Sequence, residues 1–187
     1  RYMEMALYEP GLGYYSAGAR KFGASGDFIT APEVAPVFSR CVAAQCAEVL
    51  RSLGGGDVLE LGAGSGAMAA AMLAELEVLQ SLPARYLILD VSADLRQRQR
   101  ETLAGAVPHL LDRVCWLDRL PDSLVGVVAA NEVLDAMPVE RFVVRDGSIL
   151  ALEVAWHSGR FEWVESPAAT GLRGRIERIR AEAGAHW

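Results

Sequence analysis

Short apolar runs recur along the first two thirds of the chain, and stretches of helical character lie before and between them. The runs VLEL, YLILDVS, VCWLD and the start of GVVAANEVLDAMP have the length and the continuous apolar character of buried strands. The other stretches predict helices over 34–53, 67–79 and 94–104. This alternation predicts an α/β fold with a mostly parallel sheet that is covered on both faces.

The motif TAPE carries the signals of a helix start just ahead of the first long helix. Thr30 is a typical N-cap residue, Pro32 suits a first turn, and Glu33 stands at the capping-box position. We therefore expect one amphipathic helix from this motif to Leu53. The glycine-rich stretch FGASGDFI before it is expected to be a loop, preceded by a short helix over 2–8.

The pattern changes after residue 140. RFVVRDGSILALEV and VAWHSGRFEWV predict strand–turn–strand units around Asp-Gly and Ser-Gly turns. We expect these antiparallel strands at one edge of the sheet, followed by a basic surface helix over 172–183. Residues 1–187 are predicted to form a single domain. The core positions expected in the central strands are Val58, Leu59, Leu61, Leu87, Ile88, Leu89, Val127 and Val128.

Composition narrows the class of partner. The chain has 187 residues, of which 52% are hydrophobic, and a net charge of −6. This acidic balance argues against nucleic acid or an anionic membrane as the partner, and no apolar run reaches the roughly 20 residues of a spanning helix. The three cysteines and three histidines show no metal-ligand spacing, so we expect free thiols and no metal site. The start at Arg1 leads us to expect a longer protein.

The candidate chemistry begins at ELGAGSG, where a predicted strand ends and a helix begins. Gly62, Gly64 and Gly66, with Ala63 between the first two, allow the backbone to approach a ligand closely. The spacing also fits the dinucleotide pattern, in which a pyrophosphate lies at the helix N-terminus. Glu60 disfavours that ligand, because its carboxylate would repel a pyrophosphate. It suits the ammonium and sulfonium groups of S-adenosylmethionine, and class I methyltransferases use the same spacing E/D-x-G-x-G-x-G.

Two more strand ends complete the predicted cofactor site. Asp90 follows the second strand, where its carboxylate can accept hydrogen bonds from both ribose hydroxyls. Its alternative role is to cap the next helix, which Ser92 could do equally well. Leu117 and Asp118, at the end of the third strand, are expected beside the adenine.

Four segments together resemble one known family. They are GYYSAGARKFGASGDFITAPEVAPVF, ELGAGSG, DVSADLRQRQRETL and AANEVLDAMPVERFVV. Over nearly all of residues 1–165 the chain resembles the MidA / NDUFAF-type family of methyltransferases. The resemblance implies a Rossmann-like class I methyltransferase fold, a three-layer sandwich, with S-adenosylmethionine as cofactor. For the mitochondrial branch it implies methylation of protein arginine in the matrix during assembly of respiratory complex I, whereas a bacterial member would act in the cytoplasm.

An arginine-bearing protein substrate gives roles to the residues after the fourth strand. In a sheet of order 3-2-1-4-5, Asn131, Glu132 and Asp135 emerge beside the glycine loop. A guanidinium stays protonated near neutral pH, so its methylation requires carboxylates that hold it and accept a proton. Glu132 is the first candidate and Asp135 the second, with helix capping and plain solvation as their alternatives. Asn131 is expected at the cofactor, and Asp27 in a lid above it.

Three other functions stay open. A nucleotide-dependent oxidoreductase is disfavoured by Glu60. A methyltransferase of small molecules would use the same cofactor residues. So would an assembly factor for a respiratory complex that binds S-adenosylmethionine with little or no catalysis, and only an acceptor screen separates these two from arginine methylation.

Overall fold

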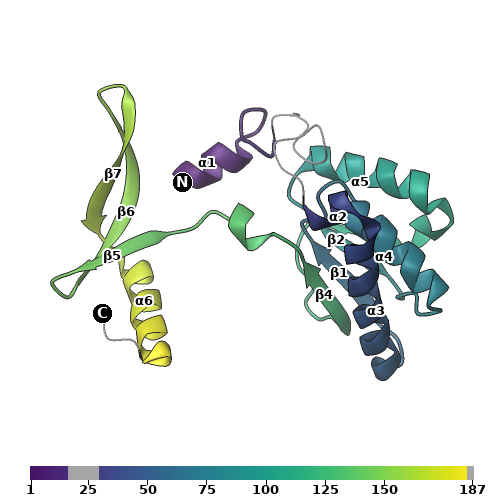
Figure 1. The fold of residues 1–187 in the computed structure, drawn as a ribbon. Coiled ribbons are helices and arrows are strands. Elements are labelled where there is room, and N and C mark those ends of the chain that lie inside the picture. Colours follow the sequence, from purple (N-terminus) through teal and green to yellow (C-terminus); the bar gives the residue numbers. More distant parts are fainter. Residues whose placement is uncertain (17–29, 185–187) are drawn as a thin grey trace. The chain divides into compact units, whose positions relative to one another are not determined.

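The computed structural model describes residues 1–16 and 30–184 (Figure 1). Within it the chain divides into two compact units, residues 5–137 and residues 1–4 together with 138–187. The predicted short helix is present as α1 (Tyr2–Tyr8). The change of pattern after residue 140 falls close to this division, but it did not by itself predict two units, and the expected single domain stays a prediction. Among the described residues, no helix combines the length and the hydropathy needed to cross a bilayer.

The larger unit is built on a four-stranded parallel sheet. Its strands are β1 (Asp57–Leu61), β2 (Tyr86–Leu89), β3 (Val114–Leu117) and β4 (Gly126–Ala130). The strand order is β3-β2-β1-β4, which confirms the α/β fold class and the predicted order of these four strands (Figure 1). Because the chain order reverses between β1 and β4, their carboxyl ends form the switch point at which open α/β sheets bind ligands.

Three helices pack against one face of this sheet. They are α3 (Pro36–Leu53), α4 (Ala67–Val78) and α5 (Ala93–Ala106), and the 3-10 helix η1 (Pro108–Arg113) then leads into β3. Val58, Tyr86 and Val114 are register partners on neighbouring strands and therefore share a face. They belong to one buried cluster with residues of all three helices, including Ala47, Leu73 and Leu103. This packing fixes the helices that follow β1 and β2 over the sheet.

The opposite face of the sheet is covered less completely. Leu59 and Leu87 are buried as predicted, but Val128 on β4 is 56% exposed, so the prediction for Val128 is wrong. In this sheet β4 has a neighbouring strand on one side only. A continuous apolar run does not distinguish such an edge strand from a central one, which explains the error.

The single helix expected from the TAPE motif is interrupted. Helix α2 (Ala31–Val34) is followed by Ala35, whose backbone is extended, with a φ of −158° and a ψ of 141°. Helix α3 begins at the next residue, Pro36. A residue that precedes proline is sterically driven out of the helical region. Thr30 makes no side-chain cap hydrogen bond, so the predicted capping box is wrong. Glu33 instead bonds to the glycine loop, as described below.

The smaller unit contains a separate antiparallel sheet. Its strands β5 (Arg141–Arg145), β6 (Ser148–His157) and β7 (Arg160–Pro167) lie in chain order. Both turns have two consecutive residues with positive φ, at Asp146–Gly147 and Ser158–Gly159, as two-residue hairpins require. The predicted turns are therefore confirmed. The strands were expected at the edge of the parallel sheet, but among the described strands they pair with one another and form a separate sheet. The sequence signals of a hairpin are local and do not say which sheet its strands join.

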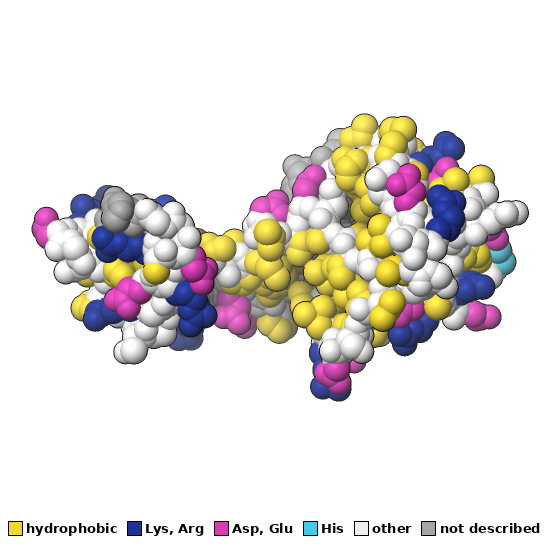
Figure 2. Space-filling view, turned by 90° about the horizontal axis from the view of Figure 1, so that it is seen from below, with side chains coloured by type: hydrophobic (Ala, Val, Ile, Leu, Met, Phe, Trp, Pro, Cys, Tyr) yellow, Lys and Arg dark blue, Asp and Glu magenta, His cyan; other side chains and the backbone are white. Residues whose placement is uncertain are grey.

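The last helix, α6 (Thr170–Ala183), covers one face of the antiparallel sheet. Leu172 and Ile176 are buried against Ile149, whereas Ile179 is 55% exposed. The arginines of α6 lie mostly on its exposed side, in agreement with the predicted basic surface helix. Figure 2 shows Lys and Arg side chains prominent on this unit, and hydrophobic side chains widespread on the larger unit.

Candidate cofactor-binding site

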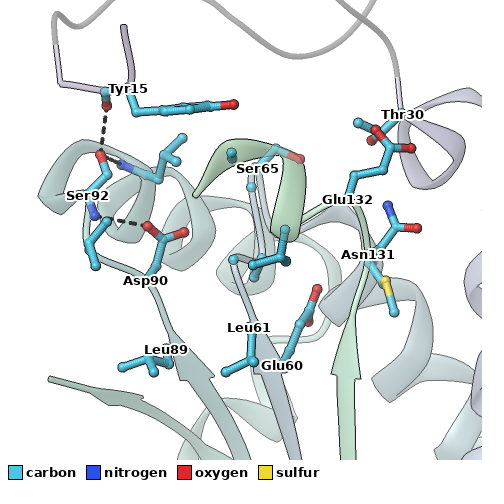
Figure 3. Close-up of a pocket in the computed structure, with 18 of the residues that line it drawn as sticks. Tyr15, Thr30, Glu60, Leu61, Ser65, Leu89, Asp90, Ser92, Asn131 and Glu132 are labelled. Carbon is cyan, nitrogen blue, oxygen red and sulfur yellow. Dashed lines mark hydrogen bonds between the residues drawn. The ribbon is translucent and has the colours of Figure 1, made fainter. Parts of the chain in front are cut away.

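A cavity of about 290 Å³ opens at the carboxyl ends of β1, β2 and β4 (Figure 3). Its walls are the glycine loop between β1 and α4, the segment after β2 and the segment after β4, with further residues from the N-terminal region. Eight of the predicted site residues line it: Glu60, Gly62, Ala63, Gly64, Asp90, Asn131, Glu132 and Asp135. The topology therefore brings together side chains that lie up to 75 positions apart in the sequence. Asp27 lies outside the described residues.

The glycine loop has a backbone that only glycine adopts easily. Gly62, Gly64 and Gly66 have φ values of 63°, 55° and 87°, all in the left-handed region. Gly62 and Gly64 line the cavity, and Ala63 between them is buried. A Cβ at Gly62 would lie 3.2 Å from a methyl group of Val133, so the loop also packs closely on the segment after β4.

Gly66 serves the packing of the loop rather than the cavity wall. It does not line the cavity, and a Cβ added to it would lie 3.0 Å from Cα of Gln99 on α5. A contact this short would require the backbone of α5 to move by a few tenths of an ångström, so together with its positive φ the close approach of loop and helix favours glycine here. The assignment of Gly66 to cofactor binding stays a prediction. In the structure Gly66 packs against α5 and thereby supports the loop whose other glycines line the cavity.

Glu60 lies on β1 with only 2% of its surface exposed, and it lines the cavity (Figure 3). Its Oε2 accepts a hydrogen bond of 2.6 Å from the hydroxyl of Tyr86. Burial raises the pKa of Glu60 to about 7, the hydrogen bond from Tyr86 opposes this rise, and the charge of Asp90 adds to it. A cationic group in the cavity would favour the ionised carboxylate and lower this pKa. Glu60 is thus suited to a ligand with an ammonium group.

Asp90 lies directly after β2 and points toward the cavity (Figure 3). Its Oδ1 accepts from the backbone N–H of Ser92 at 2.9 Å, and its Oδ2 accepts from Nε2 of Gln99 at 2.8 Å. Each carboxylate oxygen can accept a second hydrogen bond, so two hydroxyl groups could be bound. Burial is the main cause that raises the pKa of Asp90. The cap of α5 is Ser92, whose Oγ accepts from Leu95 N, so Asp90 is not needed for that role.

The end of β3 is bound to the end of β2 by one arginine. Arg96 donates to the carbonyl oxygens of Asp90 (2.7 Å) and Leu117 (2.5 Å) and to the carboxylate of Asp118 (2.7 Å). Neither Leu117 nor Asp118 lines the cavity, whereas Leu120 does. The assignment of Leu117 and Asp118 to the adenine stays a prediction that the cavity lining does not support.

Three polar side chains follow β4 and line the cavity: Asn131, Glu132 and Asp135. Glu132 has a φ of 51°, which is uncommon for a residue other than glycine and recurs at functional sites. The alternative role of Glu132 as a helix cap is excluded, because the next helix, η2 (Leu134–Ala136), has Val133 at its N-cap and no side-chain cap bond. Both Glu132 and Asp135 line the cavity, and neither forms a hydrogen bond or ion pair with another described residue.

Two tyrosines of the N-terminal region line the cavity and were not predicted. The rings of Tyr8 and Tyr15 stack with centroids 5.5 Å apart. The Tyr8 hydroxyl donates to the carbonyl of Ala136 at 2.7 Å, and Ser92 Oγ donates to the carbonyl of Tyr15 at 3.1 Å. Burial, and secondarily the charge of Asp135, raises the pKa of Tyr15. The sequence signal was only the tyrosine-rich turn LYEPGLGYY, which has no diagnostic spacing.

The TAPE motif also reaches the site in a way that its sequence did not indicate. The Ser65 hydroxyl donates a short hydrogen bond to Oε1 of Glu33, and Ala67 N donates to the same hydroxyl at 3.3 Å. Thr30 and Glu33 line the cavity. Helix α2 is therefore attached to the glycine loop through the side chains of Glu33 and Ser65. The interpretation of Glu33 as a helix-capping residue did not predict this contact.

These residues fit S-adenosylmethionine. The cavity volume is near the lower end of the roughly 300–1,000 Å³ of small-molecule sites. Glu60 could hold the ammonium group, and the free acceptor positions on Asp90 could hold the two ribose hydroxyls. Gly62 and Gly64 leave the loop without side chains where a ligand would pass between these carboxylates.

Comparison with known proteins identifies the class. Residues 41–187 match the family described as "Putative S-adenosyl-L-methionine-dependent methyltransferase". The match covers well over half of the chain, and the chain belongs to this family. Family membership confirms the predicted resemblance and the predicted cofactor, S-adenosylmethionine.

Two sets of relatives add detail. A Burkholderia thailandensis protein crystallised with S-adenosyl-homocysteine superposes with a TM-score of 0.84 at 43% identity, over 96% of this chain and 48% of that one. A native structure of a protein from the same organism superposes with a TM-score of 0.79 at 42% identity, over 94% of this chain and 45% of that one. "Protein arginine methyltransferase NDUFAF7, mitochondrial" of Danio rerio and its Drosophila melanogaster homolog are each 29% identical, over 75% and 78% of this chain. The chain spans only 39% and 38% of those two proteins.

Proposed function

We propose that this chain is the cofactor-binding core of a methyltransferase that acts on arginine side chains of a protein substrate. The observation that carries the proposal is the pair of carboxylates Glu132 and Asp135, which line the cavity beside the glycine loop and have no hydrogen-bond or ion-pair partner among the described residues. The names of the Danio and Drosophila relatives, which specify protein arginine methylation, support the choice of acceptor.

The two carboxylates have the chemistry that an arginine acceptor needs. A guanidinium is planar and presents paired N–H donors, which carboxylates bind in a bidentate manner. Binding to Glu132 would orient one nitrogen toward the cavity, and the negative charge would draw the positive charge away from that nitrogen. When bound, the cofactor supplies an electrophilic methyl group, whose bond to sulfur breaks, with the electron pair left on sulfur, as the nitrogen–carbon bond forms. Glu132 then accepts the proton that the methylated nitrogen loses.

Other cavity residues would hold the cofactor in place for this transfer. Glu60 binds the ammonium group and Asp90 binds the ribose. The glycine loop lets the backbone approach the part of the cofactor that lies between these two groups. Tyr15, whose ring lies at the cavity, would help to exclude water from the reacting groups. No metal ion and no covalent enzyme intermediate are required.

The first prediction tests the acceptor carboxylates. Glu132→Gln should keep the affinity for S-adenosyl-homocysteine and lower methyl transfer by about 10²-fold or more, because an amide keeps the shape but cannot accept the proton or balance the charge. Asp135→Asn should act in the same direction. If both carboxylates hold one guanidinium, the double variant should cost less than the sum of the single ones. Transfer is measured with methyl-labelled cofactor and cell extract on the protein that contains this chain, and methylarginine is identified after hydrolysis.

Asp122→Asn provides the control, because Asp122 is an exposed carboxylate in the loop between β3 and β4 that does not line the cavity. It should leave both affinity and transfer unchanged. Unchanged transfer in Glu132→Gln would show that this residue is not the proton acceptor. Bound cofactor without any labelled protein would contradict arginine methylation and favour a small-molecule acceptor or a binding role in assembly.

A further inference from the structure

Gln99 on α5 is a fully buried polar residue whose amide bonds in three directions. Its Nε2 donates to Oδ2 of Asp90 at 2.8 Å and to the carbonyl oxygen of Gly64 at 3.1 Å. Its Oε1 accepts from the indole N–H of Trp116 on β3 at 2.9 Å. Both donors of the amide are thus used inside the protein, and its oxygen is bound as well. Gln99 therefore connects three parts of the structure: the segment after β2, the glycine loop and β3.

The bond to Asp90 determines how that carboxylate faces the cavity. Asp90 is held on one oxygen by Ser92 N and on the other by Gln99, so its plane cannot rotate freely. Without the amide, Oδ2 would lose the donor that holds it at 2.8 Å, and the carboxylate could turn toward another donor. The orientation that leaves one acceptor position on each oxygen for a ligand therefore depends on Gln99.

The bond to Gly64 acts on the glycine loop in the same way. A trans peptide holds its C=O and N–H in opposite directions, so a carbonyl directed at Gln99 turns the N–H of Ser65 away from α5. Thr102, one turn further along α5, donates to the carbonyl of Ser65 at 2.8 Å. The absence of a side chain at Gly66 allows this helix to approach the loop. The loop conformation at the cavity is thus supported from behind by α5.

We propose that Gln99 is a positioning residue for the cofactor, whose single amide sets the ribose-binding carboxylate Asp90 and the glycine loop in one fixed arrangement. The proposal rests on the proposed cofactor site. It makes Gln99, which does not line the cavity, responsible for the selectivity for a nucleoside with free ribose hydroxyls. A neutral amide is required, because a carboxylate here would face two acceptors and a hydrocarbon would leave all three partners unbonded.

The test compares two ligands in calorimetric titrations: S-adenosyl-homocysteine and its 2′-deoxyribose analogue. Wild-type protein should prefer the ribose ligand by about tenfold or more, the scale of one hydrogen bond to a charged group. Gln99→Met should bind S-adenosyl-homocysteine about tenfold more weakly, and its preference for the ribose ligand should fall below about threefold. Asp90→Asn should lose the preference as well, and the double variant Gln99→Met/Asp90→Asn should lose little more than either one.

Gln97→Met is the matched control on the same helix, because Gln97 is exposed and, within the described part of the chain, its side chain bonds to Glu101 alone. It should leave both affinities unchanged. Gln99→Asn keeps an amide but shortens its reach by one methylene, so it provides a variant with a lower risk of misfolding and the same direction of change. Circular dichroism confirms that each variant is folded.

The outcomes separate this inference from the proposed function. If wild-type protein binds no S-adenosyl-homocysteine, the cofactor site itself is wrong. If Gln99→Met and Gln99→Asn bind both ligands more weakly but keep the wild-type preference for ribose, Gln99 only stabilises the fold and the positioning role is overturned. A lost preference in folded variants with retained residual binding confirms it.

Discussion

The burial of Glu60 disfavours its ionised form in the free protein, and this ionised form is the one that would bind a cationic ligand. Its carboxylate is almost entirely buried and has one hydrogen-bond donor, Tyr86, among the described residues. Burial raises its pKa from 4.5 to about 7. In the free protein, folding therefore favours the protonated form, and the stability that Glu60 contributes is lost as the pH rises from about 4.5 through 7. An ammonium group favours the ionised form, so binding has the opposite pH dependence.

Replacement of Glu60 should reveal both effects. In wild-type protein, affinity for S-adenosyl-homocysteine should fall about tenfold between pH 8 and pH 6, because a group with a pKa near 7 loses most of its charge in this range. Glu60→Gln should bind more weakly at pH 8 and lose most of this dependence. Without ligand, the same variant should gain stability over wild type as the pH rises from 5 to 8. Titration calorimetry and thermal unfolding measure the two effects.

The exposed Glu101 on α5 provides the comparison, since Glu101→Gln should retain the wild-type pH dependence of binding. A Glu60→Gln protein with the same pH dependence as wild type would show that this carboxylate does not meet the ligand. The ammonium group would then have to be bound by another cavity carboxylate, such as Glu33, which is bonded to Ser65 of the glycine loop.

Individual residues were predictable from the sequence where backbone geometry and charge determine their type. Glu60, the loop glycines and Asp90 follow from a strand end, a tight turn and the topology of a parallel sheet. Gln99 and Tyr15 were missed because their roles depend on which helix face or turn packs against the loop. Those contacts join residues 35 or more positions apart, and no local pattern records them.

At the scale of elements, the glycine loop is held between two helices. Helix α2 reaches it through Glu33 and Ser65, and α5 reaches it through Gln99 and Thr102. The sequence predicted the strand, the loop and α5 as separate elements but not these bonds between them. The interruption at Ala35 belongs to the same arrangement, because it separates α2, which bonds to the loop, from the core helix α3.

A methyl group at Gly66 should disturb this packing. Gly66→Ala combines a left-handed φ of 87° with a Cβ that would lie 3.0 Å from Cα of Gln99, so we expect the free energy of unfolding to fall by about 1–3 kcal/mol. Affinity for S-adenosyl-homocysteine should fall with it, because the loop must move. Urea unfolding and calorimetry measure the two quantities.

Gly105→Ala, on helix α5 against which Gly66 packs, is the matched substitution. A Cβ there meets nothing within 4 Å, and alanine favours a helix by up to about 1 kcal/mol, so stability should rise slightly and affinity should not change. Equal effects of the two substitutions would contradict the view that α5 supports the loop at Gly66.

At the scale of the whole molecule, the sequence predicted the kinds of elements better than their grouping. Strand period, hairpin turns and helix lengths are local properties, and the two hairpin turns and the parallel strand order were predicted correctly. The division at residue 137 was not predicted, because local patterns specify the hairpins of the antiparallel sheet but not whether their strands also pair with the parallel sheet. The exposed Val128 has the same cause, because burial on β4 depends on which strands and helices lie beside it.

The central claim, that this cavity binds S-adenosylmethionine through the glycine loop, is tested most directly by calorimetric titration with S-adenosyl-homocysteine and, separately, with NAD. We expect saturable heat with S-adenosyl-homocysteine and none with NAD, because Glu60 would repel a pyrophosphate. Gly64→Val should remain folded and give no heat, since a branched side chain at a φ of 55° would distort the loop and occupy the space of the ligand. Heat with NAD but not with S-adenosyl-homocysteine, or normal binding by Gly64→Val, would contradict the claim.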